Sequence, residues 1–279
     1  MNDDSFFSAP QLKRDSLGRV LARFLSIVKF APLLLGACGE SGNRSYVVTA
    51  SFPHDTGAYT QGLLFHDGAL YESTGEYGQS SLRRVDLATG RTLASVALPP
   101  SRFGEGLAVW NGRLYQLTWQ THVGYVYDAT TLGLVDSFPY DGEGWGLTSD
   151  GTLLIMSDGT ATLRFIDPRT YRVIRRVVVR DGTAPLSQIN ELEMVAGVLF
   201  ANVYQSDWIV VIEPETGQIL RWIDCADLLP ARRRTLRTDV LNGIAFDSAQ
   251  GRVFVTGKRW PELFQLRLTV PADSLRHAA

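Results

Sequence analysis

Beyond residue 45 the chain alternates short apolar runs with turns rich in Gly, Asp and Asn. Long stretches with a 3.6-residue apolar period are absent from the sequence pattern, and only residues 224–238, DCADLLPARRRTLRT, look locally helical or loop-like. Short apolar runs bounded by turn residues are typical of β-strands. The pattern therefore predicts an all-β domain.

One unit recurs along this part of the chain. Each copy opens with a strand in which a polar or aromatic residue precedes an apolar run, usually through Gly-Leu. Successive copies start 40 to 52 residues apart, at Gln61, Glu105, Trp145, Asn190 and Asn242. Repeats of about 40–50 residues with four strands each are typical of propeller blades. The sequence therefore predicts a five-bladed β-propeller with four-stranded blades.

The fifth copy lacks a fourth strand before the chain ends. The run YVVTASFP, residues 46–53, precedes the first copy and can supply that strand. We expect this N-terminal strand to close the last blade, because an open sheet edge invites aggregation. The predicted propeller domain spans residues 46–270, and residues 271–279 form a C-terminal tail.

The first residues have a different character. Lys29 precedes a short apolar run, and Leu35-Gly36-Ala37-Cys38 resembles a bacterial lipoprotein box. Residues 1–37 are therefore predicted to be a secretory leader, with Cys38 as the lipidated residue and residues 38–45 as a tether. The protein is then exported to the periplasm or cell envelope, with a lipid at Cys38 as its one membrane anchor. A short amphipathic or disordered leader is the alternative.

Composition narrows the possible chemistry. A net charge of −2 offers no basic field for nucleic acid, and two cysteines are too few for a disulfide framework. The histidines show no metal-ligand spacing, and we expect those in loops to face solvent: His54, His66 and His122. Three tryptophans on strands are expected in the core: Trp110, Trp208 and Trp222.

The repeat also predicts a pocket. The first strand of each blade lines the propeller axis, so the five opening residues lie at one height around it. The second strand is antiparallel, so its end reaches the same mouth and adds a second circle: Gly75, Trp119, Asp158, Tyr204 and Lys258. Glu105 is the one carboxylate expected in the inner circle, and we expect Gly104 and Gly106 to let the backbone turn sharply and carry it toward the axis.

Lys258 is the one lysine after the leader in a chain that otherwise uses arginine. A lone lysine suggests a need for a compact ammonium group. Structural alternatives stay open at this stage. Glu105 can cap turn amides, the carboxamides can tie blade to blade, Trp119 and Trp145 can be ordinary packing, Asp158 can be a turn residue, and Lys258 can be a surface charge.

Several segments make the sequence similar to one family. YTQGLLF, LYESTGEYGQSSLRRVDLATG, INELE, VLNGIAFD and VFVTGKRWPELF resemble the plant-type glutamine cyclotransferases, which also occur in bacteria. The similarity covers roughly residues 46–268. It implies a five-bladed propeller enzyme, an acyltransferase that converts the N-terminal Gln of peptides and proteins to pyroglutamate with loss of ammonia and without a cofactor.

The same resemblance implies roles for site residues. Glu105 matches the family's proton-transfer glutamate, and Lys258 is assigned with it to catalysis. The substrate-binding positions are Tyr59, Gln61, Phe103, Trp119, Trp145, Asn190 and Tyr204. The sequence departs from the family pattern at three places: Tyr59 stands where Phe is common, Tyr204 where Trp is frequent, and Gly104 where a bulkier residue is expected.

Two other functions are compatible with the residues. One is a non-catalytic, membrane-tethered propeller that binds proteins. The other is a metal-dependent, lactonase-like hydrolase, which requires several carboxylates around an axial calcium ion, whereas we expect one. Asn190 and Asn242 leave a structural calcium in the channel open. We expect a monomer that acts on peptides with N-terminal Gln.

Overall fold

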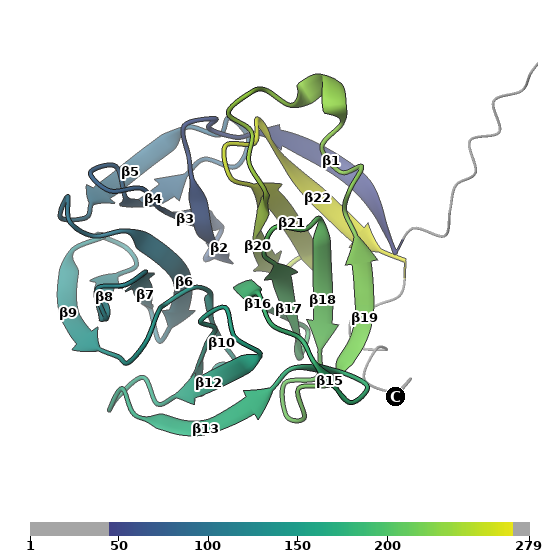
Figure 1. Ribbon diagram of the computed structural model, residues 1–279. Coiled ribbons are helices and arrows are strands. Elements are labelled where there is room, and N and C mark those ends of the chain that lie inside the picture. Colours follow the sequence, from purple (N-terminus) through teal and green to yellow (C-terminus); the bar gives the residue numbers. More distant parts are fainter. Residues whose placement is uncertain (1–44, 270–279) are drawn as a thin grey trace, which may run out of the picture. The chain divides into compact units, whose positions relative to one another are not determined.

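The computed structural model describes residues 45–269, so the predicted leader, Cys38, most of the tether and the tail lie outside the described residues. Within this range the strands form five four-stranded antiparallel sheets that follow one another around a ring (Figure 1). The prediction of a five-bladed propeller is confirmed.

The strands of each blade run from the axis outward. From the inner to the outer strand, the first blade contains β2 (Thr60–His66), β3 (Ala69–Thr74), β4 (Ser81–Val85) and β5 (Thr92–Ala97), and the second contains β6 (Gly104–Trp110), β7 (Arg113–Thr118), β8 (Val123–Asp128) and β9 (Leu134–Pro139). The third contains β10 (Leu147–Ser149), β11 (Leu154–Met156), β12 (Thr162–Ile166) and β13 (Val173–Val178), and the fourth contains β16 (Ile189–Val195), β17 (Val198–Val203), β18 (Trp208–Ile212) and β19 (Ile219–Asp224). The fifth contains β20 (Leu241–Asp247), β21 (Arg252–Gly257), β22 (Glu262–Leu268) and β1 (Tyr46–Pro53).

Strand β1 closes the ring. It pairs antiparallel with β22, from Tyr46 opposite Leu268 to Pro53 opposite Glu262, and so supplies the outer strand of the fifth blade. The pairing confirms the predicted closure. It joins the first and last strands of the propeller through main-chain hydrogen bonds, so the blades cannot separate at this point without breaking them.

Burial follows the position of each strand in its blade. Strands next to the axis are buried on both faces, whereas outer strands such as β5 and β13 alternate between exposed and partly covered positions. Five hydrophobic clusters form the core of the described part, and each lies between two neighbouring blades. Blade-to-blade packing therefore fixes the inner strands, which carry the functional side chains.

The inner strands share a local irregularity. The pairing with the second strand shifts register at residues 60–62, 104–107, 189–192 and 241–244. A bulge of this kind re-aims a side chain out of the normal alternation of a strand. The residues within these bulges include Gln61, Glu105 and Asn190, which explains why polar side chains at strand positions point to the axis.

The glycines beside Glu105 act differently from the prediction. Neither Gly104 nor Gly106 is among the residues with positive φ, so they make no left-handed turn. A Cβ on Gly106 would lie 2.4 Å from the backbone nitrogen of Leu147 and 2.6 Å from the carbonyl oxygen of Trp145. Glycine is required here because the next blade approaches the backbone closely.

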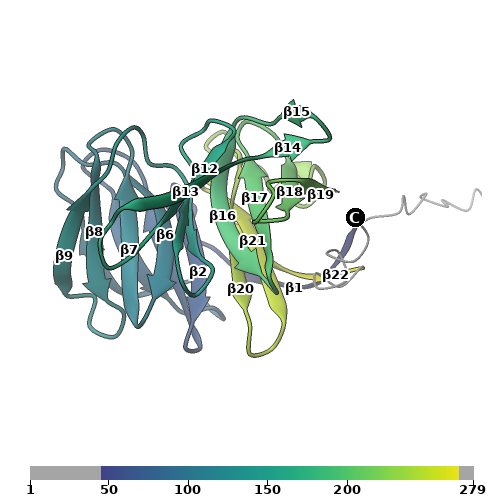
Figure 2. The same cartoon turned by 90° about the horizontal axis from the view of Figure 1, so that it is seen from below.

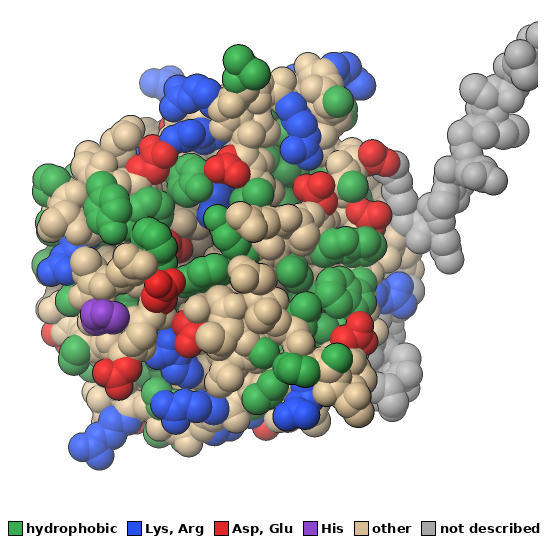
Figure 3. All heavy atoms as spheres, in the orientation of Figure 1, with side chains coloured by type: hydrophobic (Ala, Val, Ile, Leu, Met, Phe, Trp, Pro, Cys, Tyr) green, Lys and Arg blue, Asp and Glu red, His purple; other side chains and the backbone are tan. Residues whose placement is uncertain are grey.

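Two features lie outside the regular blades. Strands β14 (Arg180–Asp181) and β15 (Ala184–Pro185) form a short hairpin beside the fourth blade. Trp222 Nε1 of that blade donates a hydrogen bond to the Asp181 carboxylate at 3.1 Å. Figure 2 shows the hairpin at one edge of the ring. The 3-10 helix η1 (Ala231–Arg233) lies in an exposed loop with four arginines, and Lys and Arg side chains gather over this region in Figure 3. None of the described helices has the length and apolar character to cross a membrane.

Some burial expectations were wrong. The His54 side chain is 4% exposed, because Nδ1 bonds to the carbonyl oxygen of Trp260 and Nε2 to the Glu72 carboxylate. His122 is exposed, as expected, and His66 is partly covered. Trp208 is 38% exposed rather than in the core, while Trp110 and Trp222 are half-buried.

Candidate active site

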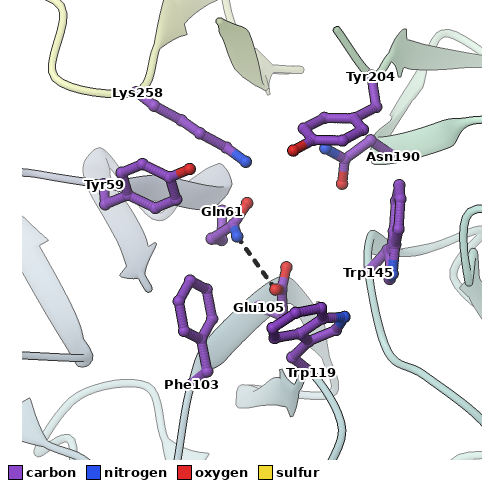
Figure 4. Close-up of a pocket in the computed structure, with 9 residues that line it drawn as sticks. All are labelled: Tyr59, Gln61, Phe103, Glu105, Trp119, Trp145, Asn190, Tyr204 and Lys258. Atoms are coloured by element: carbon purple, nitrogen blue, oxygen red, sulfur yellow. Dashed lines mark hydrogen bonds between the residues drawn. The ribbon is translucent and has the colours of Figure 1, made fainter. Parts of the chain in front are cut away.

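A cavity of about 280 Å³ lies where the inner strands converge (Figure 4). All five blades contribute to it. Its nine lining residues are Tyr59, Gln61, Phe103, Glu105, Trp119, Trp145, Asn190, Tyr204 and Lys258. These are the nine positions that sequence reasoning selected, now shown to share one space, and their chemical roles stay predictions.

Glu105 provides the acid of the cavity. Its residue is 4% exposed, and its Oε1 accepts a hydrogen bond from Gln61 Nε2 at 3.0 Å. Burial raises the pKa of Glu105 well above its ordinary value; the Lys258 charge opposes this shift and the Glu143 charge adds to it. A carboxyl group of this kind can carry a proton at neutral pH, as an acid–base catalyst must.

Lys258 provides the cation. Its residue is 2% exposed, and its Nζ lies 4.8 Å from the ring centre of Tyr59 and 5.2 Å from that of Tyr204. Burial lowers the pKa of Lys258, while Glu105 and Asp239 favour its charged form. Figure 4 shows the amine pointing into the cavity, so the surface-charge alternative is wrong.

The main chain fixes where the Lys258 side chain starts. Its amide donates to the Val240 carbonyl at 2.9 Å, and its carbonyl accepts from the Asp239 amide at 3.0 Å. These two bonds join the end of β21 to the segment that enters β20. The cation is therefore anchored to the inner part of the fifth blade rather than to a free loop.

Aromatic rings form the walls. Phe103 meets Tyr59 and Trp119 edge to face, with ring centres 6.1 and 5.7 Å apart. On the other side Trp145 meets Tyr204 at 5.3 Å, with the rings nearly perpendicular. Edge-to-face packing of this kind holds each ring in one orientation. The cavity thus has rigid apolar walls around a small polar centre, the usual composition of a small-molecule site.

The structure adds Glu143, which sequence reasoning missed. Its carboxylate accepts hydrogen bonds from Trp119 Nε1 at 2.7 Å and Trp145 Nε1 at 2.9 Å, at the edges of the two indole rings. Glu143 precedes Trp145 by two residues, in a loop that the repeat does not cover. The repeat pattern therefore carries no signal for it.

Asn242, an opening residue of the repeat, is buried away from the cavity. Its Nδ2 donates to the Thr60 carbonyl at 2.9 Å and to Gln61 Oε1 at 3.4 Å. It therefore ties the fifth blade to the first. The structural alternative was the right one at this position, and the bond to Gln61 fixes the amide that in turn faces Glu105.

Two members of the predicted second circle also lie outside the cavity lining. Asp158 bonds to Arg164 at 3.1 Å rather than facing the cavity. A Cβ on Gly75 would lie 2.3 Å from the Phe103 ring, so the glycine makes room for that ring. Their effect on the site is indirect.

The expectation of a single inner carboxylate was wrong. Glu191 on β16 is fully buried near the axis, and its two oxygens accept the backbone amides of Leu63 and Ile244 at 3.2 and 2.9 Å. Glu193, two residues on, is buried as well. Glu191 thus links three blades, which is a structural use of a carboxylate. Acidic and apolar residues alternate in the sequence NELEM, and this pattern does not indicate that both carboxylates are buried.

Metal ligation has little support in the described range. Among residues 45–269, no group of three or more His, Cys, Asp or Glu side chains is placed to hold a metal ion. The structural calcium near Asn190 and Asn242 stays a prediction.

The five-bladed propeller has an axial cavity that contains a buried carboxyl group, a buried amine and aromatic walls. This combination is typical of a propeller enzyme that acts on a small substrate. The family model described as glutamine cyclotransferase matches residues 34–268. The chain therefore belongs to the glutamine cyclotransferase family.

Two relatives show how close the similarity is. The chain is 45% identical over 227 residues to a glutaminyl-peptide cyclotransferase of Arabidopsis thaliana, covering 79% of this chain and 70% of the relative. It also matches the crystal structure of the Myxococcus xanthus glutaminyl cyclase at 37% identity and a TM-score of 0.75, covering 80% of this chain and 96% of that one.

Proposed function

We propose that this protein is a glutaminyl-peptide cyclotransferase, in which the cavity binds an N-terminal glutamine and converts it to pyroglutamate with release of ammonia. The observation that carries the proposal is the placement of Glu105 and Lys258 in one aromatic-walled cavity, in a chain of this family. The reaction transfers the glutamine acyl group from its side-chain nitrogen to the α-nitrogen, which makes the enzyme an acyltransferase of the aminoacyltransferase class.

The bond that forms joins the α-nitrogen to the side-chain carbonyl carbon of the same residue. The protein's main task is to hold the chain in the ring-closing conformation. Correct orientation of reacting groups can remove about 7–11 kcal/mol from a barrier. The rigid rings of Trp119, Trp145 and Tyr204 are suited to this task, because edge-to-face contacts and hydrogen bonds hold them in place.

Proton transfer is assigned to Glu105. The attacking amine must lose a proton, and the departing nitrogen must gain one to leave as ammonia. One carboxylate can take the first proton and deliver it to the leaving nitrogen, so the carboxylate ends as it began. The raised pKa of Glu105 favours the first transfer, because the carboxylate of a strongly acidic group would be too weak a base to take the proton from the amine.

The oxygen of the side-chain carbonyl gains negative charge as the ring closes. Lys258 and the carboxamides of Gln61 and Asn190 are the donors available around the cavity. A fixed donor aimed at such an oxygen typically contributes about 10²–10³-fold in rate. Lys258 combines a full charge with burial, so we assign the largest share to it.

The cellular setting belongs to the proposal as well. A leader ending before Cys38 would export the protein and attach it to the cell envelope by a lipid, where it would act as a monomer on peptides and proteins with N-terminal Gln. Mass analysis of the purified membrane form tests this setting. A lipid mass on a peptide beginning at Cys38 supports the anchor, and an unmodified Cys38 rules it out.

The activity is tested with a dipeptide that begins with Gln, assayed for ammonia and for peptide mass. We expect equal amounts of ammonia and cyclised peptide, with the same rate in the presence of a chelator. The matched control is the same dipeptide with an acetylated α-amine, which cannot cyclise. Absence of ammonia from the free dipeptide would refute the function, and loss of activity with chelator would favour a metal-dependent hydrolase.

A further inference from the structure

We propose that Glu143 is a positioning residue for the reaction of the cavity: one of its carboxylate oxygens fixes the two indole walls relative to each other, and its charge acts on the Glu105 carboxyl. The inference deepens the proposed function and rests on it. Glu143 does not line the cavity, so it acts through the residues that do.

The geometry of the two indoles carries the first part. Trp119 follows β7 of the second blade, whereas Trp145 precedes β10 of the third. Both Nε1 atoms donate to the same oxygen, Glu143 Oε2, at 2.7 and 2.9 Å. A single acceptor therefore sets the distance between two rings from different blades. Bonds to an ionised acceptor are short and strong, as these distances indicate.

Glu143 is itself held in place. Its second oxygen, Oε1, accepts from Gln120 Nε2 at 2.9 Å, and its backbone carbonyl accepts from an Arg164 nitrogen at 3.1 Å. Arg164 also bonds to the carbonyl of Asp141 and to the Asp158 carboxylate. The loop that carries Glu143 is therefore tied to the third blade, and the acceptor cannot drift away from the indoles.

The charge of Glu143 carries the second part. Partial burial works against ionisation, but hydrogen bonds from Gln120, Trp145 and Trp119 lower the pKa of Glu143 below its ordinary value. This charge lies within hydrogen-bond distance of the indole nitrogens of Trp119 and Trp145, which line the same cavity as Glu105, and it raises the pKa of Glu105.

Other titratable groups act on the same two carboxylates. Lys258 opposes the effect of Glu143 on Glu105 from across the cavity. Tyr140 also interacts with Glu105, but burial raises its pKa to about 12, so it stays neutral at working pH. His122 favours the ionised form of Glu143. Glu143 and Lys258 thus act on the pKa of Glu105 in opposite directions, and Glu143 supplies the negative charge.

Three variants separate the two parts. Glu143→Ala removes both the acceptor and the charge, whereas Glu143→Gln removes the charge and keeps an oxygen that can accept from both indoles. Asp141→Asn is the matched control, because it removes a charge from an exposed side chain of the same loop. Each is assayed for kcat and KM on a Gln-initiated dipeptide across pH.

The expected results differ between the variants. For Glu143→Ala we expect KM to rise about 10- to 100-fold, since two indole donors lose their shared partner. For Glu143→Gln we expect KM to change less than about threefold. In both, the acid limb of the kcat/KM profile moves to lower pH, because removing the negative charge lowers the pKa of Glu105. Asp141→Asn shows neither change.

Two outcomes would overturn the inference. An unchanged KM in Glu143→Ala would show that the walls need no acceptor, and an unmoved acid limb in both Glu143 variants would show that the charge does not reach Glu105. A readout without catalysis separates this inference from the proposed function. We expect the near-UV circular dichroism of the tryptophans to change in Glu143→Ala and to stay as in the wild type in Glu143→Gln. If the wild type releases no ammonia, the function fails while this spectroscopic test still decides the position of the walls.

Discussion

Replacing Glu105 with glutamine removes the proton carrier while leaving the cavity's shape. In the wild type, Gln61 Nε2 lies 3.0 Å from Glu105 Oε1. The side-chain oxygen of the new amide can take the place of Oε1 and accept the same hydrogen bond. We therefore expect Glu105→Gln to bind substrate nearly as the wild type does, with KM changed less than about threefold.

The loss should appear in turnover. General acid–base catalysis by a positioned side chain contributes about 10²–10⁴-fold, which corresponds to about 3–5 kcal/mol of barrier. Burial disfavours the ionised form of Glu105, as its raised pKa indicates. A neutral amide avoids that cost, so the free energy of unfolding should not decrease. The variant is expected to be as stable as the wild type and about 10²–10⁴ times slower.

The assay compares ammonia release at saturating dipeptide with thermal unfolding of the same preparations. Glu191→Gln is the matched control, because it makes the same chemical change at another buried carboxylate near the axis. Both oxygens of Glu191 accept backbone amides, and the amide nitrogen of glutamine cannot replace one of them. Glu191→Gln should therefore lose stability and keep its kcat. A Glu105→Gln variant with kcat within about threefold of the wild type would refute the reasoning.

Three further outcomes are expected. Lys258→Met should lower kcat about 10²–10³-fold. It should also move the acid limb of the kcat/KM profile to higher pH, since the Lys258 charge lowers the pKa of Glu105. A pH–rate profile measures both effects, and an unmoved limb would contradict the assignment of Lys258 to catalysis beside Glu105. Gly146→Ala should lower the unfolding free energy by about 1–3 kcal/mol, because the new Cβ would lie 2.0 Å from the Asn190 carbonyl oxygen; thermal denaturation checks it, and an unchanged midpoint speaks against close blade contact. Burial raises the pKa of Glu193 from 4.5 to about 8, so between these values the folded state holds a proton that the unfolded state has lost. Stability from this group is therefore present at low pH and falls as pH rises toward 8; a Glu193→Gln variant should show a shallower decline in urea titrations, and an equal decline would exclude Glu193 as its source.

The repeat made the fold predictable. Spacing and strand pattern indicated five blades and the closing role of residues 46–53, because propeller strands follow one another in sequence order. It also located the cavity, since the same position in each repeat reaches the same height on the axis. Glu105 and Lys258 lie far apart in sequence, and the fivefold arrangement brought them to one place.

Contacts that break the repeat were not predictable. Glu143 lies in the loop between β9 and β10, which joins the second blade to the third, and its two indole partners become neighbours through the packing of these blades. His54 was expected to face solvent from a loop, but its side chain is covered where it bonds to the Trp260 carbonyl and the Glu72 carboxylate, which are distant in sequence. The glycine beside Glu105 was expected for the wrong reason, because a pattern shows that a side chain is excluded and not which neighbour excludes it.

The central claim is that the α-amine of the substrate itself displaces ammonia within this cavity. The direct measurement uses a Gln-initiated dipeptide with a heavy nitrogen isotope in the side-chain amide, incubated with the enzyme in water enriched in heavy oxygen. The account predicts that the released ammonia carries the heavy nitrogen and that the peptide product gains no heavy oxygen. Heavy oxygen in the product would show hydrolysis to glutamate instead, and would contradict the account.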